Sequence, residues 1–315
     1  MQSRPSNWRL YLGATLAAIA LSNACHASMP AVRFAPPGTD VAKLRSDFPL
    51  NDQERLALTP DGMRALTQDQ VDQIYLRLQS GAIPDGPFRG DLFFPRDRDG
   101  HARISDLAGP APALPLLAHI GAMRAEHFGR VFWKGKAFFR SQGILRNRIE
   151  DIALLKPVFD DAETIPKITF DGQTTWLLFP AKLSCGTSRL DSTRPSTVID
   201  YARGSEVEGF RPVPDKLAGP EGLNIRDEVR IIRPGFYLGR AYFGERFALN
   251  FTLLDPTVAA GSSPSTGTQE DCNAASAAGR HLPPDAANRA ADRDSGDRNW
   301  QRGLRAARAA GAGNR

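Results

Sequence analysis

Short segments rich in aromatic and β-branched residues recur between residue 130 and residue 254, separated by turns. This spacing is typical of an antiparallel sandwich or barrel, because each segment is about one strand long and each turn reverses the chain. The segments are 130–140, 144–149, 167–170, 174–182, 196–201, 223–232, 236–243 and 246–254. The sequence therefore predicts mainly antiparallel β structure over 130–258.

The last two segments form the clearest predicted hairpin. They flank Gly244-Glu245, a two-residue connection of the Gly-X kind. A second turn is predicted at Asp171-Gly172. Alternation within the final segment places one set of apolar side chains on a single face. These side chains are Phe247, Leu249, Phe251 and Leu253.

Two amphipathic helices are predicted ahead of the strands, over 59–80 and 112–128. Thr59-Pro60 has the form of a helix start, and Thr67 and Gln70 have capping-box spacing. Apolar residues then recur at helical intervals until Gly81, which predicts a stop. We assign 59–129 as a helical region, 83–94 as a candidate first strand, and 28–58 as an irregular linker. The expected role of the helices is to pack on the sheet.

The first 27 residues have the form of a secretory signal. Arg4 and Arg9 precede an apolar run from Leu10 to Leu21, and small residues follow up to Ala27. The run is too short to span a bilayer, which needs about 20 residues. We expect export to the periplasm after cleavage behind Ala27. The alternative is a lipoprotein acylated at Cys25.

The positive charge of the chain lies at its two ends. The net charge is +5; the leader contributes +2 and the segment from Arg289 onward, with seven Arg and three Asp, contributes +4. Residues 28–288 therefore carry −1, which argues against a nucleic-acid partner. Residues 261–315 are poor in core-forming side chains, and we predict a disordered basic tail. Its Arg-rich stretch 298–308 is a candidate for peripheral contact with an anionic membrane.

Three further motifs support a resemblance to a known family. They are Gly-Pro-Phe-Arg-Gly at 86–90, Trp-Lys-Gly-Lys at 133–136, and the hairpin 235–254. Together with Asp-Tyr at 200–201 and Phe-Arg at 210–211, they follow the order found in the GXWXG-type lipocalin-like proteins of bacteria, which this chain resembles. Phe88 stands where the naming tryptophan is expected. The chain also resembles secreted proteobacterial proteins in which an Arg-Asp-Glu-x-Arg segment precedes a Tyr-Leu-Gly-Arg-Ala-Tyr strand.

The resemblance implies a fold. It implies an α+β chain that is mainly an antiparallel lipocalin-like β-barrel, with two packing helices and the basic tail. A barrel of about eight strands can enclose one small ligand. Gly86 and Gly90 would allow close backbone packing where a Cβ would not fit.

Asp227 is a carboxylate that the strand pattern places among apolar neighbours. In a strand it shares a face with Ile225, Val229 and Ile231. Such a carboxylate needs a partner or a raised pKa. Two interpretations remain open. Asp227 is either functional, as a general acid/base or as a group that orients Arg240 in an enzyme site with Tyr237, or part of a structural ion pair across the hairpin to the next strand.

Several arginines in the predicted strands are candidates for binding a carboxylate or phosphate group, since guanidinium forks bind such oxygens bidentately. If they point inward, they form a binding site; if outward, a solvated face. The candidate ligand-binding residues are Arg146, Arg148, Trp133, Arg226, Arg230, Tyr237, Arg240 and Tyr242.

Cys185 and Cys272 are the pair that remains if Cys25 leaves with the signal. An exported protein permits a disulfide between them, or the two stay separate thiols. The sequence contains neither a Gly-x-Ser-x-Gly motif, a metal-ligand spacing nor a dinucleotide fingerprint, so no metal or cofactor is predicted.

These observations predict a protein of the bacterial cell envelope that binds or carries a hydrophobic or amphiphilic small molecule, with an anionic head group as one option. The alternative is an envelope enzyme acting on a lipid or ester. A third class, an interaction module, would use the basic tail.

Overall fold

The computed structural model describes residues 32–97, 122–150, 152, 164–261 and 272. The predicted leader 1–27 with Cys25, residues 98–121 and almost all of the predicted tail 261–315 lie outside the described residues. None of the helices among the described residues combines the length and the apolar character needed to cross a membrane.

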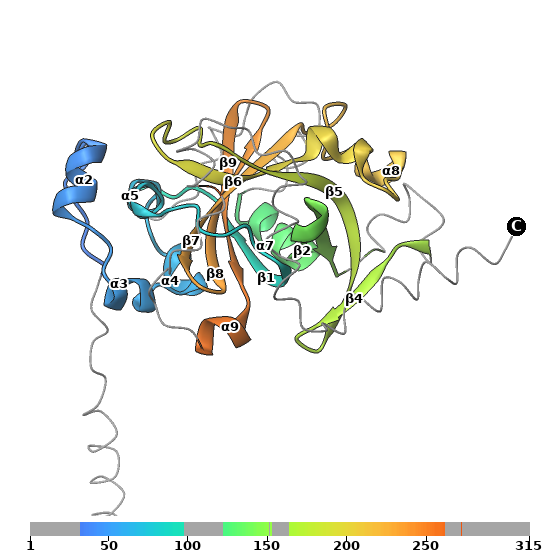
Figure 1. Ribbon diagram of the computed structural model, residues 1–315, viewed down its shortest axis with the longest axis horizontal. Coiled ribbons are helices and arrows are strands. Elements are labelled where there is room, and N and C mark those ends of the chain that lie inside the picture. Colours follow the sequence, from blue (N-terminus) through green and yellow to red (C-terminus); the bar gives the residue numbers. More distant parts are fainter. Residues whose placement is uncertain (1–31, 98–121, 151, 153–163, 262–271, 273–315) are drawn as a thin grey trace, which may run out of the picture.

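Antiparallel strands form a closed barrel (Figure 1). The nine-stranded sheet has the order β3-β2-β1-β9-β8-β7-β6-β5-β4, and an additional pairing of β3 with β5 closes the ring. Eight strands thus make an up-and-down barrel, and β4 pairs with β5 outside the ring. The strands are β1 Gly86–Phe93, β2 Trp133–Phe139, β3 Ile144–Ile149, β4 Lys167–Phe170, β5 Gln173–Thr187, β6 Pro195–Asp200, β7 Ile225–Arg233, β8 Phe236–Phe243 and β9 Arg246–Leu254.

The predicted strands and turns are confirmed, with small shifts of their ends. β8 and β9 pair across Gly244-Glu245, and β4 and β5 pair across Asp171-Gly172. Residues 130–132 differ, because they belong to helix α7 (Ala122–Phe132) and β2 begins only at Trp133. Of the predicted helix 112–128, only residues from 122 onward are described, and there the helix continues beyond 128 to Phe132.

Gly90 and Gly135 let two neighbouring strands approach closely. A Cβ on Gly90 would lie 2.5 Å from the Gly135 Cα and 2.5 Å from the Trp133 ring. Gly135 has a φ of +121° and faces the Phe88 carbonyl in the same contact. The prediction of close packing is therefore confirmed at Gly90 but wrong at Gly86, where a Cβ would meet nothing within 4 Å. The contacts at Gly90 fix Trp133 against β1.

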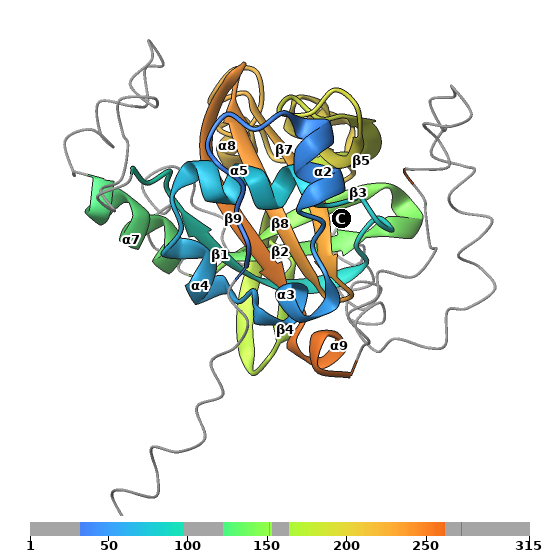
Figure 2. The same ribbon diagram turned by 90° about the vertical axis from the view of Figure 1, so that its left-hand side faces the viewer.

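Short helices cover one outer face of the barrel (Figure 2). α4 (Pro60–Arg64) begins behind Thr59, and α5 (Gln68–Arg77) begins with the predicted capping box of Thr67 and Gln70. The predicted continuous helix over 59–80 is wrong, because it is two helices and the second ends at Arg77. Beyond that point Gln79 pairs with Ile231 of β7, so the backbone is extended before Gly81.

The predicted linker 28–58 also contains helices. α2 (Val41–Asp47) is capped by Asp40, and α3 (Asp52–Ala57) begins with a capping box of Asn51 and Glu54. These helices are too short for an apolar period to show in the sequence. Long-range hydrogen bonds attach this segment, since Arg77 of α5 donates to the carbonyls of Arg33 and Phe48.

Buried apolar residues gather on both faces of the barrel wall. The interior layer faces the inside of the barrel and includes Phe88, Phe138, Tyr237 and Phe251. A second cluster lies between α5 and the outer face of β7 and β8, and a small one consists of Ala137, Phe139 and Leu177. Residues between β6 and β7, including η5 (Tyr201–Glu206) and α8 (Pro212–Asp215), contact β5. α9 (Pro256–Gly261) follows β9, and the short 3-10 helix η2 (Arg140–Gln142) joins β2 to β3.

Candidate functional site

A buried polar cluster lies inside the apolar barrel. We call it the polar centre; it consists of Trp133 and Lys136 of β2, Asn147 of β3, Tyr201 at the start of η5, and Asp227 of β7. Strand register explains the convergence. Lys136 lies opposite Asn147 across β2 and β3, so both project from the same face of the wall.

Lys136 is at the middle of the polar centre. Its Nζ donates to Asn147 Oδ1 at 2.9 Å, to the Tyr201 hydroxyl at 2.6 Å and to Asp227 Oδ2 at 2.8 Å. The same nitrogen lies 5.2–5.4 Å from the ring centroids of three aromatic side chains, which stabilise the cation through their ring faces. These are Trp133, Tyr201 and Phe251.

Asn147 and Tyr201 join the remaining groups. The Asn147 amide nitrogen donates to the Phe179 carbonyl at 3.0 Å and to the Tyr201 hydroxyl at 2.9 Å. The Trp133 indole donates to Asn147 Oδ1 at 2.9 Å. The Tyr201 hydroxyl in turn lies 3.1 Å from Asp227 Oδ2, to which it can donate. All of these side chains are thereby held in one orientation.

One oxygen of the polar centre lacks a partner. Asp227 is 3% exposed, and its Oδ1 is buried with no hydrogen-bond partner among the described residues. An unpaired buried acceptor costs about 1–3 kcal/mol, and more on a charged group. A carboxylate oxygen in this position is therefore suited to meet a donor that enters the barrel.

Burial also shifts the titration of two members of the polar centre. It lowers the pKa of the Lys136 ammonium, while the nearby Asp227 carboxylate opposes this change. Burial raises the pKa of the Tyr201 hydroxyl well above its usual range, and Asp227 raises it further. At neutral pH Tyr201 is therefore a neutral donor.

Three of the predicted site residues face the barrel interior. Asp227 is in an ion pair, but its partner is Lys136 of β2 and not, as predicted, a residue across the β7–β8 hairpin. Tyr237 belongs to the interior layer and packs edge-on against Phe88, with ring centroids 5.5 Å apart. Trp133 also contacts this layer.

The other predicted site residues lie on the outer face of the wall, so the inward-facing arginine site is not formed. They are Arg146, Arg148, Arg226, Arg230, Arg240 and Tyr242. Period-two alternation is the reason, because residues adjacent to an inward Asn147 or Asp227 must face outward. The alternative prediction, a solvated face, is also wrong for most of these residues. All of them except Arg226, which is partly exposed, are buried beneath other parts of the chain.

The outward arginines have structural partners. Arg230 donates to Asp191 at 2.8 Å and to the Arg194 carbonyl at 2.8 Å. Arg240 pairs with Asp72 of α5 on the outer face of the wall. The barrel wall therefore separates Arg240 from Asp227. The predicted catalytic set of Asp227, Arg240 and Tyr237 is therefore not brought together.

Lys136, Asn147 and Tyr201 were not predicted as site residues. Lys136 and Phe138 occupy alternate positions of one strand, so the face of Lys136 is apolar. Asn147 lies between two outward arginines, which identifies it as inward once Arg146 and Arg148 face outward. Asp227 is 91 residues from Lys136 in the sequence, and only closure of the barrel brings the two side chains together.

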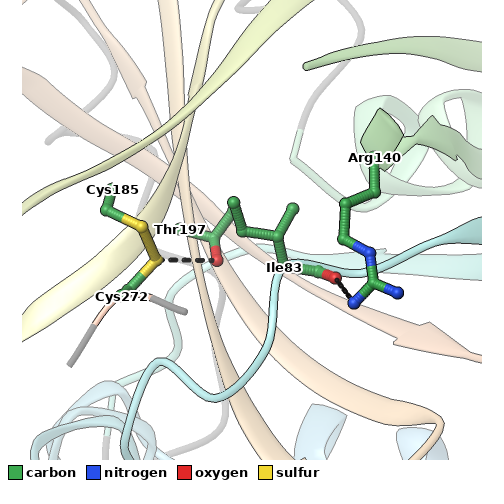
Figure 3. The surroundings of a disulfide bond; sticks show 5 residues. All are labelled: Ile83, Arg140, Cys185, Thr197 and Cys272. Carbon is green, nitrogen blue, oxygen red and sulfur yellow. Dashed lines mark hydrogen bonds between the residues drawn. A yellow bond between two sulfur atoms is a disulfide. The ribbon is translucent and has the colours of Figure 1, made fainter. Parts of the chain in front are cut away.

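The described residues also contain a disulfide. Cys185 of β5 is bonded to Cys272, and Thr197 of β6 contacts the Cys272 sulfur at 3.8 Å (Figure 3). Of the two alternatives for these cysteines, the structure has the disulfide.

Among the described residues, no group of three or more His, Cys, Asp and Glu side chains is placed to hold a metal ion. Comparisons with protein-family models, with curated proteins and with solved structures found no match.

Proposed function

We propose that this protein binds one small hydrophobic or amphiphilic molecule inside a lipocalin-like barrel. The observation that supports the proposal is the polar centre, a fixed set of polar groups with one unpaired buried oxygen in an otherwise apolar interior. A few convergent polar groups within an apolar lining are typical of small-molecule sites. Native proteins leave only a few buried polar atoms unpaired, so an unpaired carboxylate oxygen inside the barrel calls for an explanation, and a bound ligand supplies one.

The interior wall can provide most of the binding energy. Transfer of an alkyl chain from water contributes about 0.8 kcal/mol for each buried methylene, before the costs of ordering. A long chain would then bind with micromolar affinity even if its polar end contributed little. In this proposal the alkyl chain provides most of the affinity, and the polar centre fixes the orientation of the ligand.

The proposed location is the cell envelope. The signal-like segment 1–27 supports export, and the disulfide is compatible with an oxidising compartment. Peripheral membrane contact through the basic tail remains part of the proposal. Its test is the localisation of a chain lacking residues 262–315, with Cys185→Ser to avoid a free thiol.

Native mass spectrometry of the mature protein, purified from its own envelope, tests the ligand directly. We expect a stoichiometric adduct, and lipid extraction of the same sample should recover a hydrophobic compound. A mass that matches the bare chain, together with no thermal shift of delipidated protein by fatty alcohols, fatty acids, phospholipids or isoprenoids, would contradict the proposal.

Two matched alanine variants place the ligand. Ala241 of β8 faces the interior beside Asp227. Ala248 of β9 is also buried, but it lies on the outer face of the wall. Replacement by Leu overpacks either position. Only Ala241→Leu should reduce the bound adduct. Equal loss from Ala248→Leu would place the ligand outside the barrel.

A separate assay tests the enzyme alternative. Turnover of a lipid or ester would favour it if Asp227→Asn abolishes that turnover while the protein stays folded.

A further inference from the structure

The donors of the polar centre are all used within the protein. The three ammonium protons of Lys136 have three acceptors, and both amide protons of Asn147 have one each. The Trp133 indole N–H donates to Asn147. An anionic head group therefore finds no free donor within the polar centre, and it would have to break existing hydrogen bonds to bind there. The indole N–H of Trp176, which packs against the interior layer and has no partner among the described residues, lies outside the polar centre and offers a single neutral donor.

The charge of the polar centre is also balanced. Lys136 carries one positive charge and Asp227 one negative charge, 2.8 Å apart and both almost fully buried. A second buried charge of either sign would lose its hydration and gain no unpaired counterion. A cationic head would compete with Lys136 for the same carboxylate.

From this inventory we infer that the ligand has a neutral hydrogen-bond donor at its polar end, with an aliphatic alcohol as the simplest class. Its hydroxyl would donate to Asp227 Oδ1, the buried oxygen that has no partner among the described residues. The inference rests on the proposed function and gives its ligand a head group. It also replaces the anionic head group, which depended on inward-facing arginines.

Four probes with the same chain test the head group. Delipidated mature protein is titrated with 1-dodecanol, dodecanoate, dodecylammonium and dodecane at neutral pH. We expect dodecanol to bind at least tenfold more tightly than each of the other three, because only dodecanol supplies a donor without a charge. Dodecane measures what the chain contributes alone.

Asp227→Asn should change this preference in a defined direction. The substitution leaves the Lys136 charge without a carboxylate and supplies amide donors in place of the free oxygen. Dodecanoate should then bind more tightly than dodecanol. Asp72→Asn is the matched control, since Asp72 is a carboxylate paired with Arg240 outside the barrel, and it should keep the dodecanol preference.

The outcomes separate the two proposals. If all four probes bind with similar affinity, or dodecanoate binds best to the unmodified protein, the head-group inference is wrong and the binding function stands. If none of the four binds and no adduct co-purifies, both are wrong. The measurements on the unmodified protein decide the inference even where Asp227→Asn does not fold.

Discussion

Two buried ion pairs lie on opposite sides of the same wall. Lys136 and Asp227 face the barrel interior, and Arg230 and Asp191 lie on the outer face near α5. Both pairs have an N–O separation of 2.8 Å, and all four side chains are at most 4% exposed. The difference lies in how completely their remaining polar atoms are bonded.

The outer pair is fully satisfied. Arg230 also donates to Ser196 and to the Tyr75 and Arg194 carbonyls, and Asp191 accepts from Thr193 in addition. The bond to the Tyr75 carbonyl attaches α5, which lies across the barrel in Figure 2, to β7. The inner pair leaves Asp227 Oδ1 unpaired. The comparison teaches that a buried charge pair with all bonds made is structural, whereas one that keeps a free acceptor is a candidate for binding.

The largest effect is expected from breaking the inner pair. Lys136→Met leaves the Asp227 carboxylate buried without its cation, which should lower the free energy of unfolding by about 3–5 kcal/mol. Chemical denaturation measures the change. The double variant Lys136→Met/Asp227→Leu removes both charges and should recover most of the loss, and a single variant as stable as the unmodified protein would contradict the assignment.

Breaking the outer pair should cost less. Arg230→Met leaves the Arg194 carbonyl without this donor. The Tyr75 carbonyl, however, keeps its bond from the Leu78 N–H, and Asp191 keeps its bonds to Arg45 and Thr193. We expect a loss of about 2–3 kcal/mol in denaturation experiments, since each orphaned acceptor costs about 1–3 kcal/mol. Ligand selectivity should not change. A shifted selectivity would show that the outer pair also takes part in binding.

Alkaline pH should affect both sides of the wall through their tyrosines. Burial raises the pKa of Tyr75 on the outer side and of Tyr201 on the inner side, so the folded protein keeps both phenolic protons above pH 10, where the unfolded chain loses them. Each phenol therefore contributes stability that is lost as pH rises through and beyond 10, at about 1.4 kcal/mol per pH unit.

Tyr75→Phe and Tyr201→Phe should each make the unfolding free energy less steep in pH above 10. Denaturation at several pH values gives the slopes. The slope of either variant should match that of the unmodified protein below pH 9, and an unchanged slope above pH 10 would mean that the phenol ionises in the folded state.

The smallest effect is expected for an ion pair at the surface. Arg189 and Glu245 are 2.9 Å apart at the β8–β9 turn, and the Glu245 side chain is 88% exposed. Glu245→Gln should change the unfolding free energy by less than about 0.5 kcal/mol, because water already solvates the charges. A loss comparable to that of Arg230→Met would show that burial does not set the ranking.

The strands could be predicted because alternation and turn residues act locally. The hairpin at Gly244-Glu245 needs no information beyond 20 residues. The helices α2 and α3 could not be predicted in the same way, because they depend on caps and on bonds from Arg77, which is far from them in the sequence.

The polar centre shows the same limit. The apolar neighbours of Asp227 identified it as a buried carboxylate, but the partner expected across the hairpin was wrong, because Arg240 faces the other side of the wall. Lys136 was hidden in an aromatic strand, and only closure of the ring through β3 and β5 brings β2 and β7 to opposite sides of one interior. The arginines were ambiguous because alternation assigns two faces without saying which is inside.

The disulfide changes the covalent connectivity of the protein. Because Cys185 and Cys272 are 87 residues apart, the bond makes a covalent ring that includes four of the barrel strands. A protease that cuts once between Gly261 and Cys272 would open this ring without releasing a fragment. The nicked protein would migrate as one species without reductant and as two with it, so cleavage there would escape detection in an oxidising compartment.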